Sequence, residues 1–258
     1  MKRVVAPAAV VVLLLGLWQL ASEWDLLSSA LKIEDFLVPS PTQIAEALWE
    51  DRSLLADNAW VTLQEVVLGF ALAVVVGLGF AVVLHLSATL RRAVYPLLVA
   101  SQTVPVIAIA PILVVWFGFG IGPKLAIIAL VCFFPITVNA LDGLRSVDPD
   151  QVKMMRTLDA SRWQILRRVE APSALPFAFS GAKIAVAVAV IGAVFGEWAG
   201  SSSGLGHLML EASAQLLTAR LFAAIAVLSA MAICLFGLLA LAERRLIPWN
   251  NPERRTTT

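Results

Sequence analysis

The chain has 258 residues, of which 60% are hydrophobic and 14% are charged, and its formal net charge is +1. Soluble domains average about 45–50% apolar and about 25% charged residues, so this composition excludes an ordinary soluble globule. It predicts a protein that is embedded in a lipid bilayer, and nothing in its charge suggests a nucleic-acid partner.

Long apolar runs dominate the chain, and about 20 apolar residues are needed to cross a bilayer. We predict an all-α membrane protein with six transmembrane helices in a single domain, residues 1–258. A cleaved signal peptide is the alternative for the first run. The six spans are expected at approximately residues 4–20, 62–86, 93–117, 124–141, 177–199 and 220–242.

The positions of lysine and arginine predict the orientation, because cytoplasmic loops of membrane proteins carry an excess of both. If the N-terminus is cytoplasmic, 14 of the 19 basic residues fall in inside segments and four in outside segments. The remaining one, Lys183, lies near the inner end of the fifth span. We therefore expect both termini to be cytoplasmic.

Between the first two spans, SPTQIAEALWEDRSLL (residues 40–55) predicts a short helix at the membrane surface. Ser40 is suited to the N-cap, Pro41 to the first helical position and Gln43 to the third position of a capping box. Apolar residues recur on one face, which favours a packing or membrane-surface element over a binding site.

The most polar stretch, VDPDQVKMMRTLDASRWQILRRVEAPSALP (residues 147–176), lies in a predicted cytoplasmic segment. Asp148 and Ser161 are suited to helix N-caps, and each is followed three residues later by a glutamine. Asp159 stands between the two predicted helices, where aspartate tolerates a left-handed backbone better than most residues. The second helix is expected to end at Pro172, so the segment forms a helix–turn–helix hairpin.

The residues alone leave two interpretations of this hairpin open. It can lie at the interface with its arginines on lipid phosphates. It can also dock a cytoplasmic partner, with exposed apolar residues as the anchor and arginines as the rim. The apolar residues are few and consistently placed: Val152, Met155 and Leu158 on one helix, and Trp163, Leu166 and Val169 on the other.

The hairpin also carries a spaced pattern: Lys153-Met154-Met155, then Asp159 after three residues, then Val169-Glu170-Ala171-Pro172 after nine more. This spacing resembles the cytoplasmic EAA loop of binding-protein-dependent ABC importer permeases, E-A-A-x-x-x-G, nine residues, then I-x-L-P. The segments MRTLDASRWQILRRV and GEWAGSSSGLGHLM resemble the branch that carries nitrate, taurine, alkanesulfonates and thiamine-precursor pyrimidines. The resemblance covers roughly residues 60–245.

The resemblance implies a type I ABC importer permease in the cytoplasmic (inner) membrane of a bacterium. Two permease subunits, expected as a homodimer, would form the pathway, two cytoplasmic ATP-binding subunits would dock beneath, and a periplasmic or extracellular binding protein would deliver the solute. The chain has no G-x-x-x-x-G-K-[ST], so we expect a non-catalytic subunit without a cofactor or metal. The expected docking surface is Met155, Arg156, Leu158, Asp159, Ala160, Ser161 and Trp163. Lys153 is basic where the family pattern has glutamate, and this reversed charge should change which ATPase the permease accepts.

Polar residues inside the spans are candidates for lining the pathway. Gln102, in SQTVPVIAIAP, lies between Pro96 and Pro105, where freed backbone can line a cavity; a structural amide is its alternative. Thr137 and Asn139 are further candidates. Glu197 is the fourth, and at the outer end of its span it would meet the binding protein or reach water.

Small residues form a stripe in the fifth span, where Gly192, Gly196 and Gly200 repeat every four positions. Such stripes let helix backbones approach closely. Packing within one subunit and packing across a dimer both remain open.

The main alternative function is an ion-gradient-driven secondary transporter or channel, which predicts paired intramembrane carboxylates or inverted repeats. The predicted spans have no acidic residue near their middle, and the sequence shows no internal repeat. A membrane scaffold, the third alternative, leaves the polar residues between prolines unexplained. The expected solute is a small organic anion, such as a sulfonate or nitrate, or a heterocyclic vitamin precursor.

Overall fold

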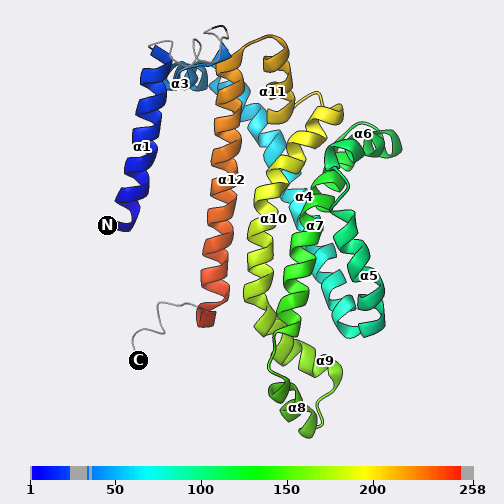
Figure 1. The fold of residues 1–258 in the computed structure, drawn as a ribbon. Coiled ribbons are helices and arrows are strands. Elements are labelled where there is room, and N and C mark those ends of the chain that lie inside the picture. The colour runs from blue at the N-terminus through cyan, green and yellow to red at the C-terminus, as the bar shows by residue number, and fades with distance from the viewer. Residues whose placement is uncertain (1, 24–33, 35–36, 251–258) are drawn as a thin grey trace. The chain divides into compact units, whose positions relative to one another are not determined.

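The computed structural model describes residues 2–23, 34 and 37–250, which are helical and contain no strand (Figure 1). The prediction of an all-α fold is confirmed. The principal helices are α1 (Lys2–Glu23), α3 (Pro41–Glu50), α4 (Arg52–Leu86), α5 (Ala88–Ser101), α6 (Val106–Phe117), α7 (Ile121–Arg145), α8 (Pro149–Thr157), α9 (Arg162–Ile165), α10 (Ala171–Gly200), α11 (Leu205–Ala214) and α12 (Thr218–Leu246).

Contacts divide the chain into two compact units. Unit 1 comprises Met1–Thr62 and Ser202–Ala230, and unit 2 comprises Leu63–Ser201 and Met231–Thr258. Helices α4 and α12 contribute residues to both units.

The centre of unit 2 is the antiparallel pair α7 and α10 (Figure 1). Gly181 faces Asn139 and the carbonyl of Pro135, whereas Gly192 faces Ile128, so contacts advance along one helix as they recede along the other. A Cβ added at Gly181 would lie 2.6 Å from the Pro135 oxygen. The stripe of small residues is therefore used for close helix packing within one subunit.

Helices α4 and α7 pack against each other and run parallel. Gly69 lies against Ile128, and Gly77, further along α4, lies against Ile136, further along α7. Because α4 and α7 run parallel, the chain that joins them must return from one end of unit 2 to the other.

Helices α5 and α6 make this return, but they do not form the straight third span that the sequence suggested for residues 93–117. They are bent by 101° at the break between Ser101 and Val106. Pro105 explains the break, since proline lacks the backbone N–H and disfavours helical backbone at the preceding residue. The bent pair has the geometry of a broken span or a re-entrant loop.

Four helices are long and apolar enough to span a membrane among the described residues, or five when the bent pair counts as one. They are α4, α7, the continuous helix Arg162–Gly200 and α12, while the apolar part of α1, Ala9–Ser22, is shorter. Helix α4 has 35 residues and begins ten positions before the predicted second span. Within unit 2, Lys183 of α10 forms an ion pair with Glu243 of α12.

Unit 1 contains the predicted surface helix, α3. Its capping box is confirmed, with Ser40 and Gln43 each accepting a hydrogen bond from the other's backbone N–H. Two side chains in the first half of α4 accept hydrogen bonds from the backbone at the start of α11. The N–H of Gly204 donates to Asn58 Oδ1 (2.7 Å), and the N–H of Leu205 donates to Thr62 Oγ1 (2.8 Å).

Candidate functional site

The first helix of the hairpin (residues 147–176) begins with the predicted N-cap and proline, but Asp148 bonds Asp150 and does not form a capping box with Gln151. The Asp148 carboxylate accepts a hydrogen bond from the backbone N–H of Asp150 (2.9 Å), and Pro149 takes the first helical position of α8. After α8, Asp159 adopts a φ of 57°, which confirms the predicted left-handed backbone. Glycine adopts this conformation without strain, which explains why the loop pattern has glycine at this position.

The second helix begins with the predicted capping box. Ser161 accepts from the backbone N–H of Gln164, and the Gln164 side chain accepts from that of Ser161 (2.7 Å). The prediction that this helix ends at Pro172 is wrong, because α9 continues through the π-helical turn Leu166–Glu170 into α10. The wider π turn makes room for the proline ring, which a regular helix would not accommodate. The hairpin is therefore joined to a spanning helix without a break.

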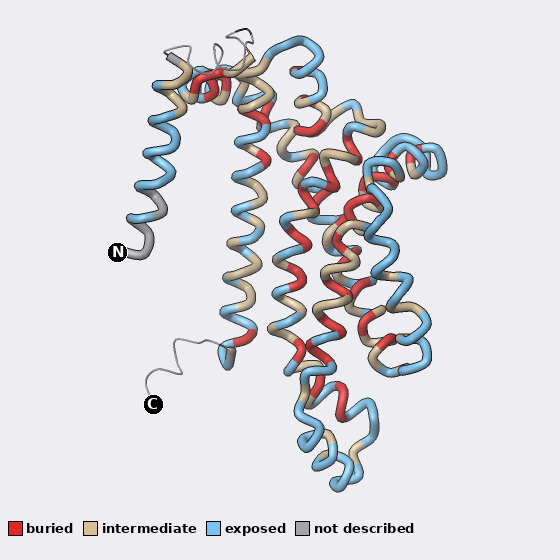
Figure 2. Tube along the Cα trace, in the orientation of Figure 1, coloured by how far each residue is buried: buried red, intermediate tan, exposed pale blue. Residues whose placement is uncertain are grey.

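The surface of the hairpin is largely exposed (Figure 2). Leu158 and Trp163 expose 71% and 62% of their surface, and Met154, which the sequence analysis did not select, exposes 58%. Large apolar side chains this exposed suit a contact surface. Of the predicted docking residues, Met155 and Ala160 are half-buried, and the exposed ones are Arg156, Leu158, Asp159, Ser161 and Trp163.

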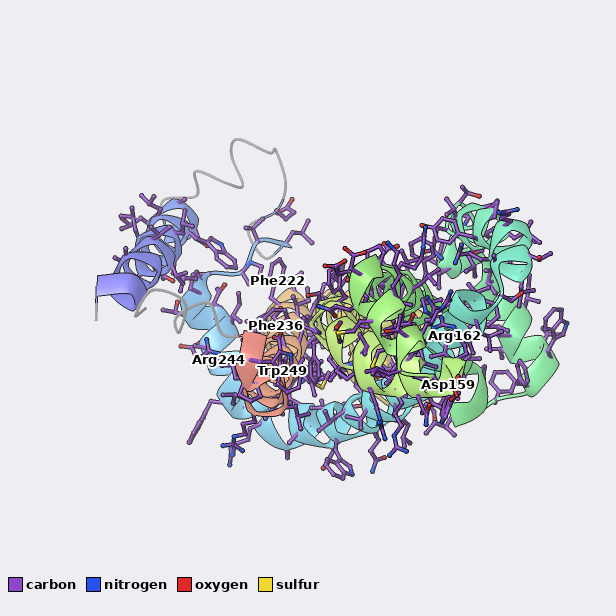
Figure 3. The ribbon with its side chains drawn as sticks, turned by 90° about the horizontal axis from the view of Figure 1, so that it is seen from below. Asp159, Arg162, Phe222, Phe236, Arg244 and Trp249 are labelled. Carbon is purple, nitrogen blue, oxygen red and sulfur yellow. The ribbon has the colours of Figure 1, made fainter. Side chains whose placement is uncertain are left out.

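Leu166 was among the apolar residues that we expected to be available for a partner, and this expectation is wrong. Leu166 is 3% exposed and packs with Leu144 of α7 and Ala174 of α10. Trp163 and Leu166 therefore serve opposite purposes, one on the surface and one in the core. Figure 3, seen from below, shows Asp159 and Arg162 on the hairpin.

Two side chains of the hairpin meet one side chain from the end of α4, and we call this group the hairpin anchor: His85, Arg162 and Glu170. Arg162 Nη1 donates to Glu170 Oε2 (2.6 Å), and His85 Nε2 lies 2.9 Å from the same oxygen. Glu170 is 5% exposed. The sequence analysis missed this cluster because His85 and Glu170 are 85 positions apart, and Glu170 holds the unspecified position of the loop pattern.

Of the pathway candidates, Gln102 lies in the break between α5 and α6. It ends α5, it is exposed, and its amide donates only a long hydrogen bond (3.4 Å) to the neighbouring Ser101 hydroxyl among the described contacts. Thr103 and Val104 beside it are also exposed. Gln102 is therefore exposed at the break in the bent helix pair, and its place in a pathway stays a prediction.

Thr137 and Asn139 lie in helix contacts and are not near Gln102 in any described contact. Thr137 is fully buried and donates to the carbonyl of Gly77 (3.3 Å), which ties α7 to α4. Asn139 donates to the carbonyl of Pro135 (2.8 Å), four residues earlier in α7, so its amide bonds the backbone of its own helix. Both side chains are used for packing within the subunit.

Glu197 belongs to a second group, which we call the buried cluster: Glu65, Lys124, Glu197 and Ser201. Lys124 Nζ donates to Glu65 Oε1 (2.5 Å) and to Ser201 Oγ (2.7 Å), and the Glu197 side chain interacts with Glu65. Glu197 is 1% exposed, so the expectation that it reaches water is wrong.

The buried cluster brings acidic side chains of two helices together. Glu65 is 2% exposed and lies well inside α4, because α4 starts earlier than the apolar run that defined the second span. Glu65 interacts with Glu197, so the paired carboxyl groups that a secondary transporter predicts are present, with Lys124 as the counter-ion of Glu65. The sequence held one signal for this cluster: Glu65, Lys124 and Glu197 all lie near the outer ends of their predicted spans.

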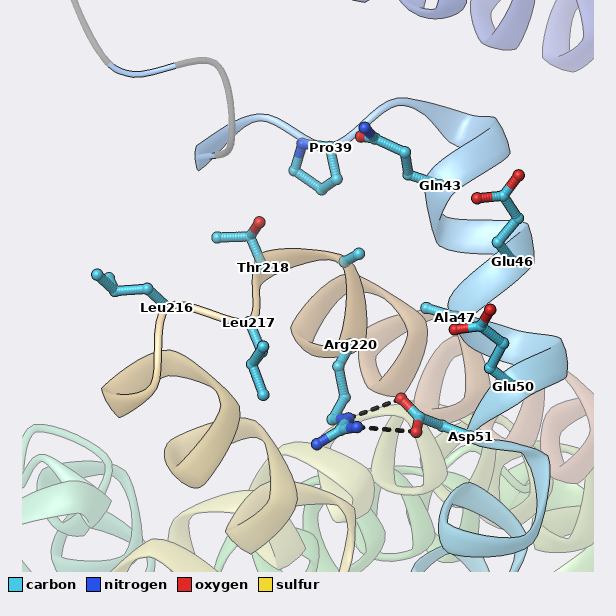
Figure 4. A pocket seen from close by; sticks show the side chains of 11 residues that line it. Pro39, Gln43, Glu46, Ala47, Glu50, Asp51, Leu216, Leu217, Thr218 and Arg220 are labelled. Carbon is cyan, nitrogen blue, oxygen red and sulfur yellow. Dashed lines mark hydrogen bonds and ion pairs between the residues drawn. The ribbon is translucent and has the colours of Figure 1, made fainter.

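Unit 1 has a groove of about 400 Å³ between α3 and the start of α12 (Figure 4). Arg220 lies in it and makes a two-bond ion pair with Asp51, at 2.6 and 2.8 Å. Glu46 and Glu50 add two acidic side chains to the lining. The groove is therefore acidic overall, with its one lining arginine already paired.

The geometry agrees with a match to known proteins. Residues 71–248 match the model of the family described as binding-protein-dependent transport system inner membrane component. The chain belongs to this family. The permease is 39% identical over 231 residues to the formylaminopyrimidine transport permease protein ThiX of Halalkalibacterium halodurans, which covers 89% of this chain and 92% of that protein.

Two further relatives extend the comparison. The permease is 38% identical to the riboflavin transport system permease protein RibX of Chloroflexus aurantiacus, over 83% of this chain and 81% of that protein. It is 31% identical to the taurine transport system permease protein TauC of Escherichia coli, over 90% of this chain and 86% of that protein.

Solved structures give the same fold. The membrane chain of an inward-facing methionine ABC transporter superposes with a TM-score of 0.64 at 20% identity, covering 77% of the permease and 97% of that chain. The permease therefore has the type I importer fold and is a non-catalytic membrane subunit of an ABC importer.

Proposed function

We propose that the permease moves its solute across the cytoplasmic membrane when separate ATP-binding subunits displace the hairpin. The observation that carries this proposal is a doubly capped hairpin that exposes Leu158 and Trp163 and continues directly into α10. Apolar anchors surrounded by arginines are typical of a protein contact, because burying them removes apolar surface from water. The proposed docking surface is the predicted one with Met154 added.

The orientation belongs to the same proposal. The excess of basic residues on one side of the predicted spans supports a cytoplasmic hairpin and cytoplasmic termini. With this orientation α3 and the acidic groove around Arg220 are outside, where Glu46 and Glu50 offer charge to a basic side chain of a binding protein. The family description supports dependence on such a protein.

We further propose that two copies of the permease assemble with two ATP-binding subunits. The small-residue face of α10 is already covered by α7, so a second copy would pack on other surfaces. In this assembly the break at Gln102 would line the pathway, since freed backbone and polar side chains within a span need water, a solute or protein around them.

A heterocyclic vitamin precursor is the solute class that the comparisons favour. Relatives at 38–39% identity are named for formylaminopyrimidine and riboflavin, whereas those named for taurine or aliphatic sulfonates are at 28–31%. Uptake of labelled formylaminopyrimidine, with taurine as the comparison, tests this choice.

The docking proposal is tested by replacing Trp163. We expect Trp163→Ala to lose most of the ATP-binding subunit that co-purifies with the permease, because large aromatic anchors contribute about 2 kcal/mol or more to an interface. Trp116→Ala is the matched control, since Trp116 is 73% exposed but lies in α6, away from the hairpin. Equal recovery of the ATP-binding subunit with both variants would contradict the proposal.

A further inference from the structure

The hairpin anchor connects three parts of unit 2 at one carboxylate. Arg162 is the first residue of α9, Glu170 ends the π turn, and His85 lies in the last turn of α4. The Glu170 side chain is 6% exposed and that of His85 is 8% exposed, whereas the Arg162 side chain is 42% exposed. A buried carboxylate therefore holds one partner from the hairpin and one from α4.

The chemistry of His85 makes Glu170 the fixed member of the anchor. His85 Nε2 is 2.9 Å from Glu170 Oε2 and 2.7 Å from Arg162 Nη2, and Nδ1 has no hydrogen-bond partner among the described residues. With a proton, Nε2 donates to Glu170; without one, it accepts from Arg162. It cannot do both at once, but Arg162 Nη1 donates to Glu170 in either state.

The remaining contacts of α4 at this end are apolar. Ala81 and Leu84 share a buried cluster with Ala140 and Leu141 of α7, and Val82 packs against the cluster formed by Leu144, Leu166 and Ala174. Apolar contacts are not directional and allow sliding, whereas charge-assisted hydrogen bonds fix a geometry. Helix α10 follows the hairpin through a continuous backbone, but α4 has no such connection.

We propose that Glu170 is the positioning residue that makes α4 move together with the hairpin, by holding Arg162 and His85 on one carboxylate. The inference rests on the proposed function, in which ATP-binding subunits displace the hairpin. It assigns a role to the variable position of the V-E-A-P segment: this residue transmits movement to α4 and does not contact the ATP-binding subunit.

The test measures the distance between α4 and the hairpin with spin labels at Val83→Cys and Gln151→Cys, in a permease whose Cys132 and Cys234 are replaced by alanine. Both labelled positions are exposed and lie outside the docking surface. With Glu170 intact we expect one narrow distance distribution, both in the permease alone and in its complex with the ATP-binding subunits, and ATP should leave it unchanged. With Glu170→Gln we expect a broad distribution that shifts further when ATP binds.

Amide exchange of residues 162–170 gives a second readout of the same variant. We expect exchange to accelerate about 10-fold in Glu170→Gln, because a hydrogen bond to a charged group stabilises by that factor or more. Glu170→Asp, which keeps the carboxylate, should recover part of the narrow distribution. Asp150→Asn is the matched control, since it breaks the ion pair with Lys153 on the same hairpin, whose side chains are 81% and 74% exposed, and it should change neither readout.

The two proposals can fail separately. A Glu170→Gln permease with wild-type distances and exchange would overturn the anchor, whatever the ATP-binding subunits do. If Glu170→Gln does not fold, Arg162→Gln makes the same test from the exposed side of the anchor. Loss of the ATP-binding subunit in Trp116→Ala as readily as in Trp163→Ala would instead overturn the docking proposal and leave the distance measurements on the permease alone intact.

Discussion

Unit 2 has a group of charged side chains near each end, the buried cluster and the hairpin anchor, and the two groups differ in their exposure to water. The buried cluster, where α7 begins, pairs Lys124 with Glu65 at side-chain exposures of 8% and 3%. The hairpin anchor, where α7 ends, pairs Glu170 with Arg162, whose side chain is 42% exposed. Removing one partner of a buried ion pair leaves an uncompensated charge away from water, whereas removing the partner of the half-exposed Arg162 leaves a charge that water can reach. The two ends should therefore differ in how much stability the loss of one partner costs.

Breaking the buried cluster should have the largest effect on stability. Lys124→Met leaves the Glu65 carboxylate buried without its counter-ion, which costs about 3–5 kcal/mol in such pairs. We expect a lower thermal midpoint and a lower yield of folded permease in detergent. Lys153→Met removes a lysine from an exposed pair and should cost at most about 1 kcal/mol. A buried-cluster variant as stable as its exposed control would remove the distinction between the two ends.

The helix contact between the two ends can be tested by adding one methyl group. Gly181→Ala places a Cβ against the Pro135 carbonyl and the Asn139 side chain, and it should destabilise by about 1–3 kcal/mol through overpacking. Gly79→Ala is the control, because no atom lies within 4 Å of an added Cβ there. The free energy of unfolding in denaturant should fall for the first variant and stay equal or rise for the second.

The smallest expected effect concerns the turn of the hairpin. Asp159 has a φ of 57°, so Asp159→Gly should keep the turn, whereas Asp159→Val should cost about 1–2 kcal/mol in local stability. Amide exchange of the turn should rise in the valine variant, with the buried cluster unaffected. Equal exchange in both variants would show that the left-handed backbone does not limit the stability of this end.

Much of the site followed from local sequence, because its determinants act over a few residues. The cap at Asp148, the capping box at Ser161 and the left-handed Asp159 depend on side chains bonding nearby backbone, and all three are confirmed. The prediction that the second helix ends at Pro172 was wrong, because α9 continues through the π turn into α10, and Leu166 of that turn packs against Ala174 of α10.

The sequence by itself determined an all-helical membrane chain, a capped hairpin and the importer family, since apolar length, capping and motif spacing are properties of neighbouring residues. Only the tertiary structure decided that Lys124 and Glu65 are partners, that His85 meets Glu170, and that the third span is bent by 101°. Charges separated by tens of residues have no fixed distance until helices pack. Here the glycines of α4 and α10 set that distance by letting α7 approach closely.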